Sequence, residues 1–327
     1  MLHKPLFNYC SRCLFSFILC LFILSIYGSG FQRFQIQQRE HGTVLRGGIW
    51  YPCTNPDRQF KVGDMTLMGV PDCALTQSSL PLIVLSHGSG GSALSHHDTA
   101  KALADSGFVV AAINHSGDNF LDLSQQGQLS IFASRPNDIR SLIDYMVGQW
   151  SGREHLAEES IGFFGFSRGG YTGLVLGGGI PDLGLLVSFC DKQNIPFCQE
   201  IKTKNLPVIA AEDKRIKSFV IVDPVNLFTE KSLYNISAPV QLWVSELGGD
   251  GVTPERMASI YKSSITSENQ LIKGAGHFAF LAPCTEQQKI TIPFICTDHS
   301  DFDREKFHQY FNKELVRFFS FTLGKPK

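Results

Sequence analysis

The segment 160–174 constrains the fold more than any other, and it reads S-I-G-F-F-G-F-S-R-G-G-Y-T-G-L. An apolar run from Ile161 to Phe166 predicts a buried strand, and the polar residue after it, Ser167, stands between Gly165 and Gly169. A G-x-S-x-G pattern between a strand and a helix is typical of a nucleophile elbow, a strained turn that exposes the serine hydroxyl. Small residues are required on both sides because the two backbones approach closely there. The alternative is a glycine-rich turn with an incidental serine, and the flanking strand and helix favour the elbow.

Strands alternate with helices along the rest of the chain. This order predicts an α/β fold with a doubly wound, mostly parallel sheet and helices on both faces. We expect strands at 42–51, 60–68, 80–86, 108–113, 161–166, 219–222, 240–245 and 270–273, and helices at 95–106, 137–147, 254–264 and 303–323. The irregular stretch 177–216 is predicted to be a small cap insertion over the pocket, with ordinary packing as the alternative.

Composition agrees with a folded domain and gives no hint of a polyanionic partner. Of the 327 residues, 43% are hydrophobic and 18% are charged, so one domain with a substantial core is expected over residues 31–327. The formal net charge is -1, and no basic run or basic-aromatic alternation occurs. Nucleic acid is therefore not an expected partner.

The N-terminus has the order of segments found in secretory signal peptides. Lys4 and Arg12 precede an uncharged run, Leu14 to Tyr27, and Gly28-Ser29-Gly30 then supply small residues for cleavage. The apolar run is shorter than the roughly 20 residues that span a bilayer comfortably. We therefore predict a signal peptide over residues 1–30 and an exported, periplasmic or secreted protein, with an uncleaved membrane anchor as the alternative.

Cysteine usage is consistent with export. Three of the nine cysteines lie in the predicted leader, which leaves an even number in the domain. These fall in neighbouring pairs along the chain, Cys53 with Cys73, Cys190 with Cys198 and Cys284 with Cys296. We predict disulfides within these pairs. None of the paired cysteines stands in a C-x-x-C motif, which disfavours zinc ribbons and thioredoxin-like redox chemistry.

A glycine-rich loop, His87-Gly88-Ser89-Gly90-Gly91, directly follows the predicted strand 80–86. In chains with a nucleophile elbow, a backbone N–H of this loop joins the N–H of the residue after the serine to bind the developing oxyanion. The predicted donors are therefore the N–H groups of Ser89 and Arg168, and we expect the Arg168 side chain to be replaceable. A loop without a function is the alternative, because the Gly-Lys-Ser/Thr ending of a phosphate-binding loop is absent.

Position in the chain selects the base, because elbow enzymes carry the serine, the acid and the histidine in that order. His277 follows the last predicted strand and is the predicted base. His87 and His115 precede Ser167, and His87 is interpreted as a residue that shapes its loop. The pair at 96–97 is interpreted as the exposed start of a helix.

Two aspartates compete for the role of the acid. Asp250 follows the predicted strand 240–245, and Asp223 ends the predicted strand 219–222. Either carboxylate could orient the imidazole and stabilise its charged form. We prefer Asp250 because the end of the later strand is the usual acid position in this architecture. Asp223 stays open as the alternative, and Glu246 is the third candidate.

These motifs together resemble the dienelactone hydrolase-like branch of the α/β-hydrolase family, and they are similar to platelet-activating-factor acetylhydrolases and cutinase-like polyester hydrolases. The segments that carry the resemblance are L-S-H-G-S-G-G at 85–91, N-H-S-G-D-N at 114–119, R-P-N-D-I at 135–139, G-F-S-R-G at 165–169, G-A-G-H-F at 274–278 and F-L-A-P-C at 280–284. The resemblance implies an α/β-hydrolase fold over most of residues 42–322. Dienelactone hydrolases use a cysteine nucleophile, so Ser167 argues against a dienelactone substrate. Acetylhydrolases place their acid after the earlier strand, the position of Asp223.

The expected function is an exported serine ester hydrolase of the carboxylesterase, lipase or acetylhydrolase kind. Ser167 would form an acyl-enzyme, with Asp250 and His277 as acid and base and the Ser89 and Arg168 N–H groups as oxyanion donors. No cofactor or metal is expected. The expected partner is a small ester or a lipid, which would place the chain in lipid degradation and in contact with a membrane surface. A non-catalytic binding module and an acyltransferase with the same residues are the alternatives.

Overall fold

The computed structural model describes residues 28–37, 43–191, 196–209, 212–263 and 265–324. Within these ranges one mixed sheet has ten strands in the order β10-β9-β8-β7-β5-β6-β2-β1-β4-β3. The strands are β1 (Gly28–Gln37), β2 (Val44–Cys53), β3 (Arg58–Val62), β4 (Met65–Pro71), β5 (Leu80–Ser86), β6 (Val109–Asn114), β7 (Leu156–Phe166), β8 (Ile216–Val222), β9 (Val240–Ser245) and β10 (Thr266–Ile272). Strands β5 to β10 pair in parallel, whereas β1, β2 and β6 run antiparallel to one another in turn. The predicted mostly parallel sheet is confirmed.

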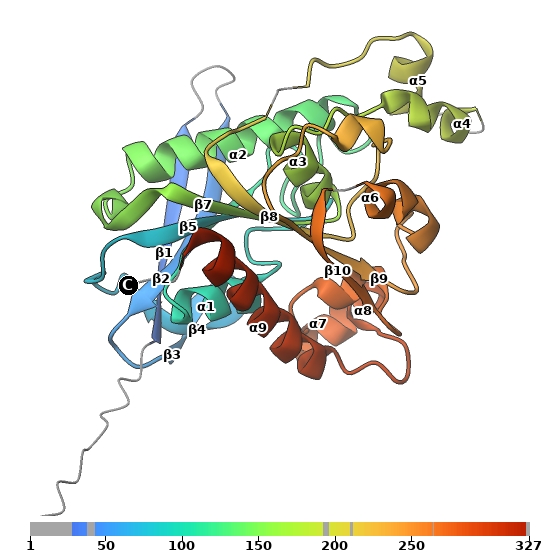
Figure 1. The fold of residues 1–327 in the computed structure, drawn as a ribbon. Helices are drawn as coiled ribbons and strands as arrows, with labels where there is room; N and C mark the ends of the chain where they lie inside the picture. The colour runs from blue at the N-terminus through green and yellow to red at the C-terminus, as the bar shows by residue number, and fades with distance from the viewer. Residues whose placement is uncertain (1–27, 38–42, 192–195, 210–211, 264, 325–327) are drawn as a thin grey trace, which may run out of the picture.

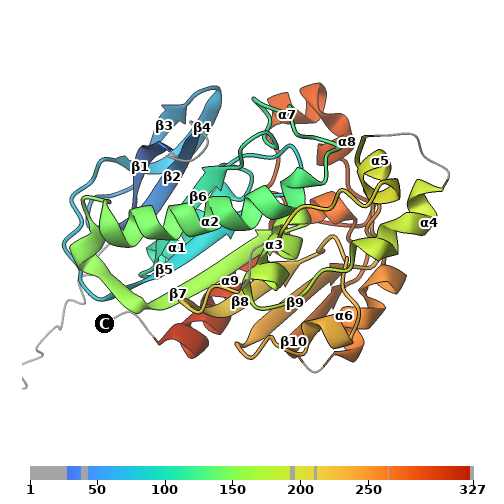
Figure 2. The ribbon, with the colours of Figure 1, turned by 90° about the horizontal axis from the view of Figure 1, so that it is seen from above.

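Helices cover both faces of the sheet. In the described ranges they are α1 (His97–Asp105), α2 (Ser130–Gly148), α3 (Arg168–Leu176), α4 (Val187–Cys190), α5 (Pro196–Lys202), α6 (Ala258–Lys262), α7 (Glu286–Thr291), α8 (Pro293–Cys296) and α9 (Arg304–Leu323). Helices α2 and α3 lie on one face, and α1 and α9 lie on the other (Figure 1, Figure 2).

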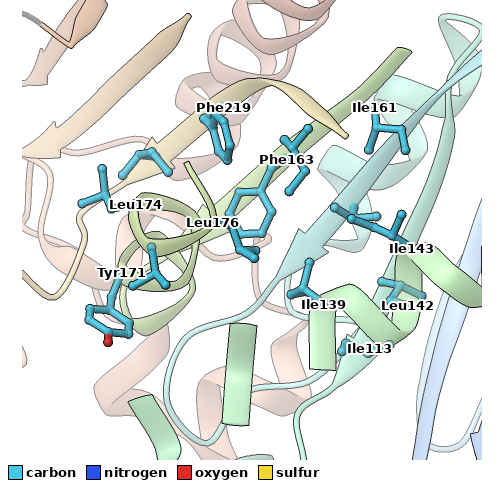
Figure 3. Packing of buried hydrophobic residues seen from close by; sticks show 14 of the residues in the cluster. Ile113, Ile139, Leu142, Ile143, Ile161, Phe163, Tyr171, Leu174, Leu176 and Phe219 are labelled. Carbon is cyan, nitrogen blue, oxygen red and sulfur yellow. The ribbon is translucent and has the colours of Figure 1, made fainter. Parts of the chain in front are cut away.

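Each face has its own apolar core. Leu142 of α2 and Leu174 of α3 pack with Phe163 of β7 in the cluster drawn in Figure 3. On the opposite face, Leu103 of α1 and Phe311 of α9 belong to a second buried cluster. Both faces of β5 are covered, so every residue of this strand is buried, and the strand is apolar from Leu80 to Leu85. The sheet is thus a rigid base for the loops at its strand ends.

The strand order places two loops at a topological switch point. From β5 the chain crosses to β6 on one side, and it then returns through α2 to β7 on the other side of β5. The loop after β5 and the turn after β7 therefore lie side by side at the carboxyl edge of the sheet. Open α/β sheets bind their ligands at such a position.

The structure differs from the sequence prediction in three local features. The predicted strand 60–68 is a hairpin, in which Gly63 with φ 58° reverses the chain between β3 and β4. Helix α2 begins at Ser130 rather than at 137, and Pro136 lies inside it. Proline is rare in helix interiors, and the prediction therefore began the helix after it. The short helices α7 and α8 were not predicted.

The predicted leader, residues 1–30, ends inside β1. Gly28, Ser29 and Gly30 pair with β2, with Gly30 opposite Tyr51. Residues 1–27 lie outside the described ranges, so the predictions of a signal peptide and of export remain predictions. Among the described residues, no helix is both long and apolar enough to cross a membrane.

The three predicted disulfides, Cys53–Cys73, Cys190–Cys198 and Cys284–Cys296, are present in the structure. The second disulfide joins α4 to α5 within the insertion, which lies at one edge of the molecule (Figure 1). The insertion borders a cavity of about 800 Å³, and neither Ser167 nor His277 lines it. Its role as a cap over Ser167 therefore remains a prediction.

Candidate active site

Ser167 occupies a strained turn between β7 and α3. Its backbone angles, φ 55° and ψ -117°, lie outside the regions that residues other than glycine ordinarily adopt. Glycine is required on both sides: a Cβ on Gly165 would lie 2.2 Å from the Gly169 carbonyl oxygen, and one on Gly169 would lie 2.0 Å from that of Ser86. The Ser167 N–H donates to the Val222 carbonyl oxygen at 2.8 Å, which ties the turn to the end of β8. This geometry matches the predicted elbow.

Asp223 and His277 form a buried pair beside this turn. The Nδ1 atom of His277 lies 3.0 Å from Oδ2 of Asp223, and both side chains are buried. A carboxylate only accepts hydrogen bonds, so Nδ1 carries a proton, and in the neutral ring the lone pair is then on Nε2. The His277 ring stacks on that of Phe166, the residue before Ser167, with centroids 4.6 Å apart. Nε2 is buried and has no hydrogen-bond partner among the described residues.

Ser245 at the end of β9 holds the carboxylate in place. Its N–H donates to Oδ1 of Asp223 at 2.8 Å, and its hydroxyl donates to Oδ2 at 2.5 Å. Oδ1 of the carboxylate is thus bonded to the Ser245 N–H, and Oδ2 is shared between the Ser245 hydroxyl and His277. Sequence reasoning missed Ser245, although its position at a strand end beside two candidate acids was a usable signal.

The structure pairs His277 with Asp223 and not with Asp250, which the sequence analysis preferred. Asp250 lies exposed in the turn after β9. The loop supports the histidine through its backbone instead, because the His277 N–H donates to the Gly248 carbonyl oxygen at 2.7 Å. Glu246, the third candidate, accepts from the Gly274 N–H at 2.8 Å. All three candidate acids follow a strand, so that position alone does not separate them. Only Asp223 is buried against His277.

The two predicted oxyanion donors belong to segments that adjoin Ser167. Ser89 lies in the loop after β5, and a Cβ on neighbouring Gly88 would come within 3.2 Å of Ser167 Cβ. Arg168 is the first residue of α3, where a backbone N–H has no acceptor within the helix. The Arg168 side chain, which we expected to be replaceable, donates through Nη1 to the buried carboxylate of Asp118 at 2.8 Å, and its replaceability stays a prediction.

His87 shapes the loop after β5, as interpreted from the sequence. Its Nε2 accepts from the His115 N–H at 3.1 Å, so Nδ1 carries the proton and donates to the Gly88 carbonyl oxygen at 2.6 Å. Burial, and then the charge of Arg135, lower the pKa of His87 well below its usual value. The ring is therefore neutral at physiological pH and acts as a fixed hydrogen-bonding spacer.

A second Ser-His-Asp arrangement lies beneath the site. His115 contacts the Ser86 hydroxyl through Nε2 at 2.8 Å and the Asp138 carboxylate through Nδ1 at 3.1 Å. All three side chains are buried, and Ser86 has no exposed surface. Ser86 therefore lacks the access to substrate that a nucleophile needs, and the arrangement links β5, β6 and α2.

Two further histidines pack near His277. His96 is buried between the rings of Phe164 and Phe166, so its interpretation as an exposed helix start was wrong. Burial lowers its pKa to about 3. His308 of α9 contacts the Ala279 carbonyl oxygen at 2.9 Å and the Asp98 carboxylate at 2.6 Å. It thereby ties the segment after His277 to α1.

A small cavity of about 190 Å³ adjoins His277, with Gly249, Phe278 and Asp298 in its lining. Within the part of the chain that the structure describes, no group of three or more His, Cys, Asp or Glu side chains is arranged to hold a metal ion.

Comparison with solved structures identifies the fold. A ferulic acid esterase from Streptomyces cinnamoneus aligns with a TM-score of 0.62 and 15% identity, over 93% of this chain and 92% of that chain. The chain has the α/β-hydrolase fold. A dienelactone hydrolase from Anabaena variabilis aligns to this chain with a TM-score of 0.48 and 15% identity, over 90% of this chain and 99% of that chain. At the level of sequence, no curated protein matches it.

A family model adds a more specific similarity. The model described as platelet-activating factor acetylhydrolase, isoform II, matches residues 56–123 of this chain. That segment contains β5, β6 and the loop with Ser89. The resemblance to acetylhydrolases expected from the sequence is therefore supported by the family model, in a segment that precedes Ser167.

Proposed function

We propose that this α/β-hydrolase is a serine ester hydrolase in which Ser167, His277 and Asp223 act together. His277 Nε2 takes the proton of the Ser167 hydroxyl as the serine attacks the ester carbonyl carbon. The alcohol leaves with that proton, and a water molecule, deprotonated by His277 in turn, cleaves the acyl-enzyme. The N–H groups of Ser89 and Arg168 stabilise the oxyanion in both steps.

The observation that carries this proposal is the buried Asp223–His277 contact beside a serine in a strained elbow. Asp223 fixes the tautomer that leaves Nε2 free, and the His277 ring stacks on that of Phe166, the residue before Ser167. A carboxylate of this kind also stabilises the imidazolium that forms during attack. Asp223 replaces Asp250 as the proposed acid.

Exposed apolar side chains beside the oxyanion loop favour an ester with an apolar group. The loop after β6 exposes Phe120 and Leu121, and the Phe120 N–H donates to the Gly91 carbonyl oxygen at 2.9 Å. Phe278, next to the base, has its ring 6.1 Å from that of exposed Phe294. Such apolar surface on both sides of a site stabilises an acyl or alcohol chain by burying it. We therefore propose esters with apolar chains, including lipids, as substrates.

The test is hydrolysis of p-nitrophenyl acetate, butyrate, octanoate and palmitate by the wild type and by Ser167→Ala. Turnover of at least one ester by the wild type, lost in the variant, is the expected result. Equal rates in both proteins would overturn the proposal. Product analysis with an added alcohol separates hydrolysis, which releases the acid, from acyl transfer, which yields a new ester.

A further inference from the structure

Asp118 lies in the loop after β6, is fully buried and touches neither Ser167 nor His277. Its Oδ1 accepts from the Gly90 N–H at 3.2 Å and from the Ser89 hydroxyl at 3.4 Å. Its Oδ2 accepts from Arg168 at 2.8 Å and from Arg135 at 2.5 Å. One carboxylate thus bonds to both residues whose N–H groups are the proposed oxyanion donors.

The two donors need such a connection because they belong to different elements. Ser89 stands on the loop after β5, and Arg168 begins α3 after β7. Stabilisation of an oxyanion requires both N–H groups at about 2.7–3.1 Å from one point, and it weakens sharply when either moves. The two segments also meet where Gly169 packs on Ser86 and where Gly88 packs against Ser167, but these contacts do not involve Ser89 itself.

Arg135 of α2 links Asp118 to the loop after β5. It bonds to Asp118 with one nitrogen and to the His87 carbonyl oxygen with another, and its side chain is fully buried. Burial raises the pKa of Asp118, but the charges of Arg135 and Arg168 outweigh this effect and lower the pKa to about 2. Asp118 is therefore ionised throughout the pH range in which an esterase is assayed.

We propose that Asp118 is a positioning residue that holds the two halves of the oxyanion hole at a fixed separation, with the Arg168 side chain as its link to the elbow. This inference rests on the proposed function, because it assumes an oxyanion at Ser167. The charged contacts are made in the resting protein, so the donors need no rearrangement when charge develops in the transition state. The Arg168 side chain therefore has a role of its own, separate from that of its N–H.

The test compares kcat and KM for a p-nitrophenyl ester in Asp118→Asn and Arg168→Met, with Asp122→Asn as the matched control. Asp122 is an exposed acid of the same loop whose carboxylate accepts from Gly117 and Ser124 of that loop. We expect kcat to fall about 10–100-fold in Arg168→Met and at least as much in Asp118→Asn, with KM nearly unchanged, because only the transition state carries the oxyanion. Asp122→Asn keeps the wild-type kcat.

Two further variants distinguish the possible failures. Arg168→Lys restores a cation near Asp118 and is expected to recover part of the kcat lost in Arg168→Met, which a purely structural role would not predict. If Asp118→Asn does not fold, Arg168→Met decides, since it keeps the buried Asp118–Arg135 pair. A wild-type kcat in folded Arg168→Met, or a loss expressed only in KM, overturns the inference. Activity that survives Ser167→Ala overturns the proposed function instead.

Discussion

Replacing Asp223 by asparagine tests the assignment of the acid with almost no change in side-chain volume. The Ser245 N–H, 2.8 Å from Oδ1, can only donate, so it selects the asparagine carbonyl oxygen for that position. The NH₂ group then replaces Oδ2, which lies 3.0 Å from Nδ1 of His277. Facing a donor, Nδ1 must give up its proton and the proton moves to Nε2. The nitrogen that should accept the Ser167 proton is thereby blocked.

We therefore expect kcat of Asp223→Asn to fall about 10⁴-fold, equivalent to about 5 kcal/mol of transition-state stabilisation. Asp250→Asn is the matched control, because Asp250 is exposed and its φ of 48° suits asparagine as well as aspartate. The assay is hydrolysis of a p-nitrophenyl ester near neutral pH, with thermal unfolding of each variant to verify its fold. A loss of about 10³-fold or more in Asp250→Asn, with Asp223→Asn within about tenfold of the wild type, would refute the reasoning.

Two further predictions concern stability. Gly169→Ala places a Cβ 2.0 Å from the Ser86 carbonyl oxygen, and we expect it to lower the free energy of unfolding by about 3 kcal/mol in denaturant titrations. Gly148→Ala is the control, because its Cβ would have nothing within 4 Å and should leave stability unchanged or raise it. An unchanged free energy of unfolding in Gly169→Ala would contradict the close approach. His96 has a folded pKa of about 3. In the folded protein His96 therefore stays neutral down to about pH 3, whereas in the unfolded chain it binds a proton below about pH 6.5. Protonation then favours the unfolded state, so the free energy of unfolding decreases as the pH falls from about 6.5 towards 3. Between about pH 7.5 and about pH 5 this effect lowers the free energy of unfolding by about 2 kcal/mol. We expect His96→Phe to remove this part of the pH dependence. An unchanged pH dependence in that variant would contradict the burial of a neutral His96.

The elbow was predictable because its evidence is local. Gly165, Ser167 and Gly169 lie within one turn, and the close contacts of the glycines follow from that turn alone. The loop with Ser89 was equally predictable from its place after an apolar strand. Features that depend on neighbours along the chain are therefore well described by the sequence.

The choice of the acid depends on contacts between distant residues. Asp223 and Asp250 each follow a strand, and both have positive φ angles. They differ in what packs against them: Asp223 meets His277, 54 residues away, and Asp250 is exposed. Strand-end position carries no information about that difference.

Buried polar residues were the other features that the sequence did not reveal. His96 precedes a helix, where polar side chains are usually exposed, and only packing against Phe164 shows that it is buried. Asp118 and Arg135 lie in segments that carried the resemblance to a family, yet nothing in their spacing predicts that they meet. A buried ion pair depends on tertiary packing, which a single sequence does not display.

The central claim, that Ser167 is the nucleophile of an ester hydrolase, is tested most directly by mapping the adduct of a fluorophosphonate probe. Wild-type protein is incubated with the probe, and its peptides are then sequenced by mass spectrometry. We predict one adduct, on Ser167, and none in the Ser167→Ala variant, because Ser86 in the second Ser-His-Asp arrangement is fully buried. An adduct on Ser86, or undiminished labelling of Ser167→Ala, would contradict the account.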